Sequence, residues 1–168
     1  HNTSIKPWPC CRHTHPVIDS ALELSKQLNF EKIESIELGV TKAAISVCDQ
    51  PNPETLYDAK FSLQHCVSVA LLDGEVGFYS FEPDSRKRAA ALAMLVSLSQ
   101  NEEFEKAYPE SWGAEVIVKL SDGKEFTVRR EHAKGDPEFP LSELEIREKA
   151  MMLFRYGGVP DPEYCMEL

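Results

Sequence analysis

"AEVIVKLSDGKEFTVRREH", residues 114–132, carries the clearest secondary-structure signal in the chain and decides its fold class. Apolar residues alternate with others in two runs, Val116-Val118-Leu120 and Phe126-Val128, on either side of Asp122-Gly123. An Asp-Gly dipeptide between two alternating runs is typical of a tight β-hairpin. The stretch therefore predicts two antiparallel strands.

Working outward, residues 33–40 alternate in the same way and predict a third, half-buried strand. Residues 92–100 fit either a buried helix or a fourth strand. Four helices are predicted: from Thr14, as capping residue, to about Leu28; from near Asp58 to Asp73-Gly74; from Asp84 onward; and from Ser142 to Gly157-Gly158. The sum is an α+β domain, an antiparallel sheet of about four strands covered by helices.

Length and charge narrow the functional classes. The 168 residues suit one domain with a real core, and 28 acidic against 18 basic residues give a formal net charge of −10. That average charge repels a phosphate backbone, so we expect no nucleic-acid partner. No apolar run reaches the length of a membrane span, and the start is no signal peptide, so we expect no membrane association.

The cysteines indicate a reducing compartment. Their number, five, is odd, and Cys10 and Cys11 are adjacent, which does not favour a bridge between them. We therefore expect free thiols and a cytoplasmic location. The chain begins at His1 rather than at methionine, so we expect either that something has been removed from its start or that it is a segment of a longer protein.

"KPWPCCRHTHP", residues 6–16, concentrates the chemistry of the chain. Cys10, Cys11, His13 and His15 are possible metal ligands, but their spacing fits no common zinc pattern, so no metal is predicted. The two residues that separate the cysteines of a thioredoxin-like pair are missing.

An anion-binding loop is the better physical interpretation of this stretch. Lys6 supplies a point charge, and Arg12 offers a planar fork for a carboxylate or phosphate. The histidines donate hydrogen bonds or carry protons, and a helix that begins near Thr14 adds backbone N–H groups. A surface loop with buried, backbone-satisfied histidines remains the alternative.

Elsewhere the sequence shows no complete active site. His65 lies inside a largely apolar predicted helix, where a histidine is commonly a satisfied core residue. The chain contains no Gly-x-Ser-x-Gly elbow, no phosphate-binding glycine loop and no dinucleotide fingerprint.

Four stretches in this order resemble the MmgE/PrpD family, which includes 2-methylcitrate dehydratase, cis-aconitate decarboxylase and iminodisuccinate epimerase. They are "IKPWPCCRHTHPVIDSALEL" (5–24), "YDAKFSLQHCVSVALLDGEV" (57–76), "VIVKLSDGKEFTVRRE" (116–131) and "KGDPEFPLSELEIREKAMMLF" (134–154). The resemblance spans nearly the whole chain.

The resemblance implies a longer protein with a helical domain and a smaller α+β lid, and an active site between them. This chain is similar to the lid, over residues 1–156, with residues 157–168 as a tail or the start of a return to the helical domain. The implied chemistry is proton abstraction beside a carboxylate of a small di- or tricarboxylic acid. It needs no cofactor, and a homodimer is the implied assembly.

The resemblance also implies roles for single residues. Lys6 resembles the lysine that holds a substrate carboxylate, and His15 resembles the histidine that closes the first motif. Cys11 stands where decarboxylase-like members often carry a histidine, and His65 where they carry a tyrosine. The proton-transfer groups belong to the helical domain, so no complete catalytic set is expected here. The implied substrate-binding residues are Lys6, His65, His15, Arg12, Cys11 and His13.

The expected function is therefore that of a substrate-binding lid in a 2-methylcitrate dehydratase-like lyase. The alternatives are a non-catalytic carboxylate-binding module, or an isomerase, epimerase or decarboxylase of the same family.

Overall fold

The computed structural model of the chain describes residues 3–28 and 30–166. The chain divides into two compact units. The larger unit is Trp8–Ala133, and the smaller unit combines His1–Pro7 with Lys134–Leu168.

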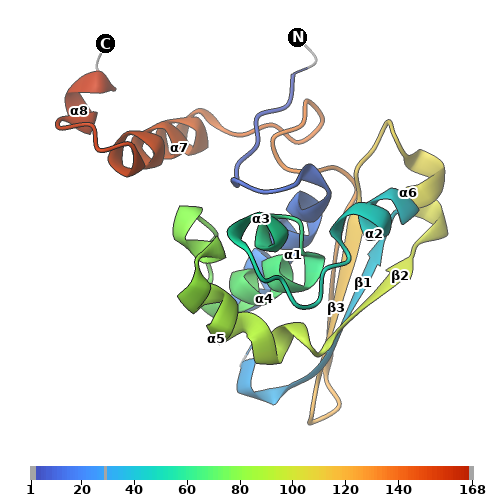
Figure 1. Cartoon of the computed structure of the whole chain (residues 1–168). Coiled ribbons are helices and arrows are strands. Elements are labelled where there is room, and N and C mark those ends of the chain that lie inside the picture. Colours follow the sequence, from blue (N-terminus) through green and yellow to red (C-terminus); the bar gives the residue numbers. More distant parts are fainter. Residues whose placement is uncertain (1–2, 29, 167–168) are drawn as a thin grey trace. The chain divides into compact units, whose positions relative to one another are not determined.

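The larger unit contains a four-stranded sheet (Figure 1), in the order β2-β1-β3-β4. The strands are β1 (Ile33–Val40), β2 (Val96–Gln100), β3 (Ala114–Leu120) and β4 (Glu125–Arg130). The predicted α+β class is confirmed. The β1–β3 and β3–β4 pairs are antiparallel, whereas β1 and β2 are parallel, so the sheet is mixed. The helical segment between β1 and β2 is long enough for the crossover that a parallel pair requires.

The predicted hairpin forms β3 and β4. Val116 pairs with Val128, and Val118 with Phe126, in the antiparallel register. Gly123 has φ +85°, a left-handed conformation that glycine adopts without a steric penalty. Alternate residues of β3 are buried, which is why the pattern was readable from the sequence.

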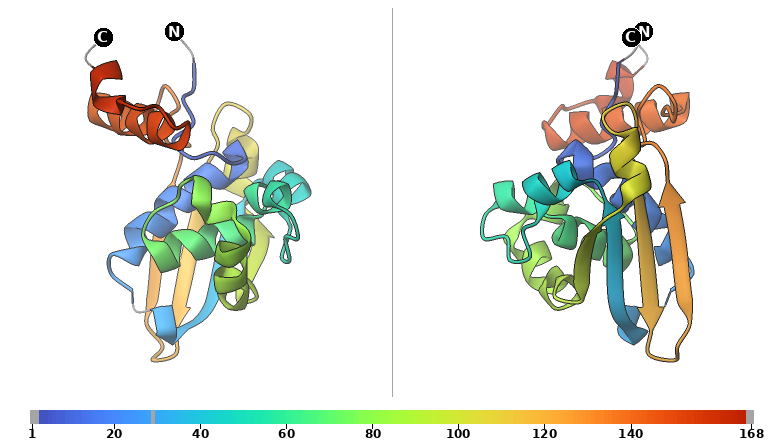
Figure 2. Two further views of the ribbon diagram at one scale, coloured as in Figure 1. Left: turned by 60° about the vertical axis from the view of Figure 1, so that its left-hand side comes forward. Right: turned by 90° about the vertical axis from the view of Figure 1, so that its right-hand side faces the viewer.

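Helices α1 (His15–Ser25) and α4 (Leu63–Asp73) build the core with the sheet. Helix α1 packs on β3, β4 and α4, and the left view of Figure 2 shows both helices in front of the strands. Every residue from Leu63 to Leu71 is buried, so α4 is a core helix. The remaining helical elements are η1 (Arg12–Thr14), η2 (Phe30–Lys32), α2 (Lys42–Cys48), α3 (Leu56–Lys60), η3 (Phe78–Phe81), α5 (Pro83–Ala93) and α6 (Glu102–Ala107).

Some local predictions were wrong. The single helix expected from Asp58 is two helices, α3 and α4, because Ser62 leaves the helical conformation and caps α4 by accepting from the His65 N–H at 2.9 Å. Thr14 does not cap α1 through its side chain. Its hydroxyl donates instead to the carbonyl of Cys11, at 2.8 Å.

The smaller unit contains α7 (Glu143–Tyr156) and α8 (Pro162–Cys165). Ser142 and Glu145 form a capping box at the start of α7, but no residue of this helix is buried. The N-terminal segment is tied to the loop after residue 133, since Ile5 N donates to Gly135 O at 2.9 Å. Gly135 has φ +92°, and a Cβ there would lie 1.9 Å from Ile5 O, so only glycine fits.

Candidate functional site

The chemistry-rich loop is fixed to the core of the larger unit. Cys11 N donates to Lys60 O at 2.9 Å, which holds the loop against the end of α3. Thr14 is fully buried, and its hydroxyl also lies 3.2 Å from Cys10 Sγ. Residues 10–14 therefore form an ordered entry to α1.

Arg12 and His13 pack on an aromatic side chain that the sequence interpretation missed. The Arg12 guanidinium carbon lies 4.2 Å from the Trp112 ring centroid, and the His13 ring stacks on Trp112 at 4.4 Å. Tyr108 completes the group, 6.0 Å from His13 and 5.3 Å from Trp112 between ring centroids. We call Arg12, His13, Tyr108 and Trp112 the aromatic–cation cluster. Stacking restricts the guanidinium and orients its fork of N–H donors.

Burial and the neighbouring Arg12 charge lower the pKa of His13 below its usual value. His13 is therefore neutral at neutral pH, with one ring nitrogen as donor and the other as acceptor. In the cluster the positive charge belongs to Arg12, and His13 is a neutral hydrogen-bonding group.

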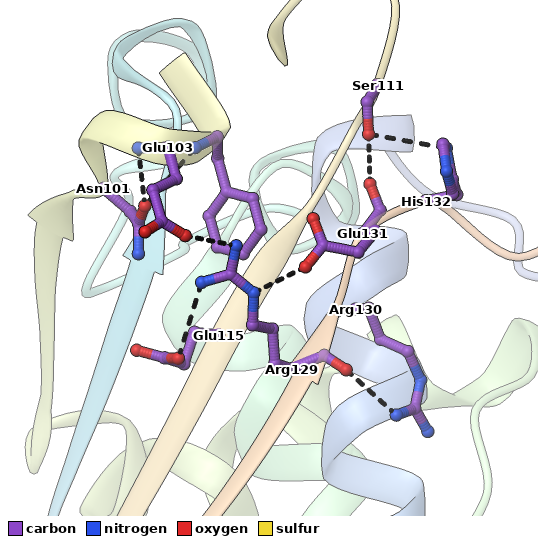
Figure 3. A network of polar contacts seen from close by, with 9 residues as sticks. Asn101, Glu103, Ser111, Glu115, Arg129, Arg130, Glu131 and His132 are labelled. Carbon is purple, nitrogen blue, oxygen red and sulfur yellow. Dashed lines mark hydrogen bonds and ion pairs between the residues drawn. The ribbon is translucent and has the colours of Figure 1, made fainter. Parts of the chain in front are cut away.

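A polar network fixes the loop that carries Trp112 (Figure 3). Ser111 donates to the carbonyl of Glu131, and its hydroxyl lies 3.4 Å from His132 Nδ1. Trp112 Nε1 donates to Pro109 O within the same loop, at 3.1 Å. These bonds hold the loop against the end of β4 and so position the tryptophan under Arg12.

Arg129 anchors the same network. Its guanidinium pairs with Glu131 at 2.6 Å and with Glu103 at 2.7 Å, and lies 4.4 Å from the Phe104 ring centroid. The hydrogen bond to Glu131 is the main cause that raises the pKa of Arg129. The next residue, Arg130, pairs with Asp19 and with Glu23 of α1. Both arginines have carboxylate partners and serve the scaffold.

His15 is the first residue of α1 and is 1% exposed. Its ring lies edge-on to Trp8 at 5.3 Å and hydrogen bonds with Cys10. Among the described residues, its buried Nε2 atom has no hydrogen-bond partner. A buried polar atom without a partner is uncommon in a native protein.

His65 is also 1% exposed, on α4. Its Nε2 lies 2.8 Å from Ser80 O, and its ring is tilted against Phe81 at 5.9 Å. A carbonyl accepts, so Nε2 carries the proton. Burial lowers the pKa of His65 and the bond to Ser80 opposes that shift. The substrate-binding role of His65 stays a prediction, and its visible contacts are those of a packed histidine.

Four cysteine side chains in and around residues 10–14 form two pairs. Cys10 contacts Cys66 of α4, and Cys11 hydrogen bonds with Cys48 at the end of α2. Burial would raise the pKa of Cys10, but hydrogen bonds with Cys66 and His15 outweigh it and lower that pKa. Burial, followed by the hydrogen bond with Cys10, raises the pKa of Cys66.

Lys6 is exposed and belongs to the smaller unit. Its carbonyl accepts from Lys149 Nζ of α7, so the two lysines are neighbours. Burial, and then the positive charge of Lys6, lower the pKa of Lys149. Two adjacent cations attract an anion, and Lys149 is a further candidate residue that no local sequence signal identifies.

The predicted site residues therefore lie in several separate groups of contacts rather than in one site. Arg12 and His13 share one cluster, His15 and Cys10 a second, Cys11 and Cys48 a third, and His65 lies against η3. Over residues 3–28 and 30–166, no three or more His, Cys, Asp or Glu side chains are arranged to hold a metal ion. No helix in that part of the chain is both long and apolar enough to span a membrane.

Comparison with known proteins places the chain in a family. The model of the MmgE/PrpD C-terminal domain matches residues 8–163. Cis-aconitate decarboxylase of Mus musculus is 26% identical over 158 residues, which cover 88% of this chain and 32% of that protein. Cis-aconitate decarboxylase of Homo sapiens is 26% identical over 161 residues, with the same coverage. The chain thus spans about a third of the length of these relatives. It belongs to the MmgE/PrpD C-terminal domain family, as the resemblance of its four motifs implied.

Proposed function

We propose that this chain is the substrate-binding lid domain of a cofactor-free MmgE/PrpD-type lyase that acts on small di- and tricarboxylic acids. The reaction is removal of a proton beside a carboxylate, followed by elimination of water. The general base comes from protein outside this chain. The whole enzyme is a cytoplasmic homodimer in this proposal.

The family match over residues 8–163 is the observation that carries the proposal. The related proteins from mouse and human are named for a decarboxylase, an enzyme of the lyase class. Membership in the family supports catalysis in the longer protein. It does not choose among dehydration, decarboxylation and epimerisation.

The surroundings of the cations support carboxylate binding. Arg12 is held on Trp112, which restricts the guanidinium before any ligand binds and so reduces the entropy lost on binding. Lys6 has Lys149 as a cationic neighbour, and a carboxylate would relieve their repulsion. Neutral His13 adds a hydrogen-bonding group beside Arg12.

Decarboxylation is the second candidate, favoured by the names of the two relatives. His65 argues against decarboxylation. It replaces the tyrosine that the resemblance places there, and its Nε2–H already donates to Ser80 O. A group held in that way does not supply a phenol-like donor to a substrate.

The experiment is turnover of a carboxylate panel by the purified full-length protein. The panel contains 2-methylcitrate, citrate and cis-aconitate, with product identification by mass spectrometry. Formation of an unsaturated tricarboxylate supports dehydration, and release of carbon dioxide supports the second candidate. Binding of these acids without any turnover would contradict the enzyme proposal and support a non-catalytic carboxylate-binding module instead.

A further inference from the structure

Two hydrogen bonds hold the segment of the smaller unit that carries Lys6. Ile5 N donates to Gly135 O at 2.9 Å, and the Lys6 carbonyl accepts from Lys149 Nζ. The segment passes so close to Gly135 that a Cβ there would lie 1.9 Å from Ile5 O and 3.2 Å from Pro7 Cδ. The backbone around Lys6 is therefore fixed, although the residue itself is exposed.

Lys149 has an acidic neighbour on its own helix. Glu145 precedes it by four residues on α7, a spacing at which glutamate and lysine commonly pair. Glu145 pairs instead with Lys134, and it also accepts from Ser142 N at 2.9 Å. Lys149 donates to the Lys6 carbonyl, and an ammonium donor makes a stronger hydrogen bond than a neutral one.

These contacts form a closed ring within the smaller unit. Gly135 holds the N-terminal segment, and the residue before it, Lys134, pairs with Glu145 of α7. One turn further along α7, Lys149 returns to the segment at Lys6. Loss of the Lys149 amine therefore opens the ring at the contact made by Lys6 itself.

We propose that Lys149 is a positioning residue, which holds the Lys6 backbone so that the Lys6 ammonium group is presented to a substrate carboxylate. A group that is restricted before binding loses less conformational entropy when the ligand binds. The inference rests on the proposed function, because it requires Lys6 to bind the substrate. Lys149 acts through Lys6 and needs no contact of its own with the substrate.

Steady-state kinetics of the full-length protein test this role, with 2-methylcitrate, citrate and cis-aconitate as substrates. Lys149→Met keeps an apolar stem and removes the donor. We expect KM to rise about three- to tenfold and kcat to change by less than about twofold. Lys149→Arg, which retains a cationic donor, should restore most of the lost affinity. Arg147→Met, at an exposed arginine of the same helix, is the matched control and should leave both constants unchanged.

A double variant distinguishes positioning from a general structural role. In a Lys6→Ala background, Lys149→Met should raise KM no further, because the cation that Lys149 positions is already gone. Hydrogen exchange gives a readout that does not depend on activity. Lys149→Met should speed exchange of the Ile5 N–H, which is bonded to Gly135 O, and Arg147→Met should not.

The failures of this inference and of the proposed function are distinguishable. If Lys6→Ala raises KM but Lys149→Met does not, the positioning role alone is wrong. Additive effects in the double variant, or unchanged exchange of the Ile5 N–H in Lys149→Met, would equally overturn it. A wild-type protein that neither binds nor converts these acids would overturn the proposed function, and this role of Lys149 with it.

Discussion

Helices α4 and α7 begin in the same way and are stabilised differently. Ser62 caps α4 and Ser142 caps α7, each accepting from the backbone N–H three residues later. In α4 every residue from Leu63 to Leu71 is buried, whereas none of the 14 residues of α7 is. A cap therefore marks where a helix starts and says little about what stabilises it.

The energies follow from that difference. Each fully buried leucine of α4 contributes about 2–3 kcal/mol through removal of apolar surface from water. Helix α7 is stabilised locally, by its capping box and by ion pairs of Glu145 with Lys134 and of Arg155 with Glu163. Exposed pairs of this kind contribute less than about 1 kcal/mol each.

Truncating one leucine in each helix gives the largest expected contrast. Leu71→Ala should lower the free energy of unfolding by about 3 kcal/mol, because removing this fully buried side chain of α4 leaves a cavity in the core. Leu144→Ala, at a side chain 65% exposed, should change it by less than about 0.5 kcal/mol. Urea denaturation followed by circular dichroism measures both. Equal losses would show that the two helices are buried alike.

Removing each serine cap gives an intermediate contrast. Ser62 is buried and also donates to Gln50 O at 2.6 Å, so Ser62→Ala removes the partner of the buried His65 N–H and one donor to the Gln50 carbonyl. We expect a loss of about 2 kcal/mol. Ser142→Ala leaves the N–H groups of the first turn of α7 exposed to water. We therefore expect faster hydrogen exchange in that turn and little change in the free energy of global unfolding. A larger global effect of Ser142→Ala than of Ser62→Ala would refute the contrast.

Acidification should give the smallest difference in stability between the two helices, because its effect is confined to α7. Lys134, together with Ser142, lowers the pKa of Glu145 from 4.5 to about 2. Because the folded chain binds this proton less readily than the unfolded chain, the stabilisation is present above pH 4.5. It is lost as the pH falls toward about 2. Exchange rates in the first turn of α7 should rise over that range, and Glu145→Gln should remove the pH dependence. An unchanged profile in the variant would assign the effect to other carboxyl groups.

The elements that sequence reasoning predicted well are those with a local periodic signal. Strand β1 and the β3–β4 hairpin alternate along the chain, and their boundaries agreed closely with the structure. Helices α2 and α6 were missed because they are short, and their caps, Thr41 and Asn101, are common loop residues. The parallel direction of β2 depends on a crossover that no local pattern encodes.

The site was predictable only where its residues are consecutive. Arg12 and His13 were identified as candidates from one stretch, but Trp112 lies far along the chain and no motif joins it to them. Lys149 reaches the Lys6 carbonyl from α7, another contact without a local signal. Such pairs depend on tertiary packing, and a single sequence does not show them.

The central claim is that the opening loop recognises substrate carboxylates, and Lys6→Ala tests it most directly. The measurement is kcat/KM of the full-length protein for its preferred tricarboxylate, with Lys87→Ala, an exposed lysine of α5, as the matched control. We predict a loss of at least about tenfold for Lys6→Ala, the effect of losing one charge-assisted hydrogen bond, and no change for Lys87→Ala. A Lys6→Ala protein with wild-type kcat/KM would contradict the account.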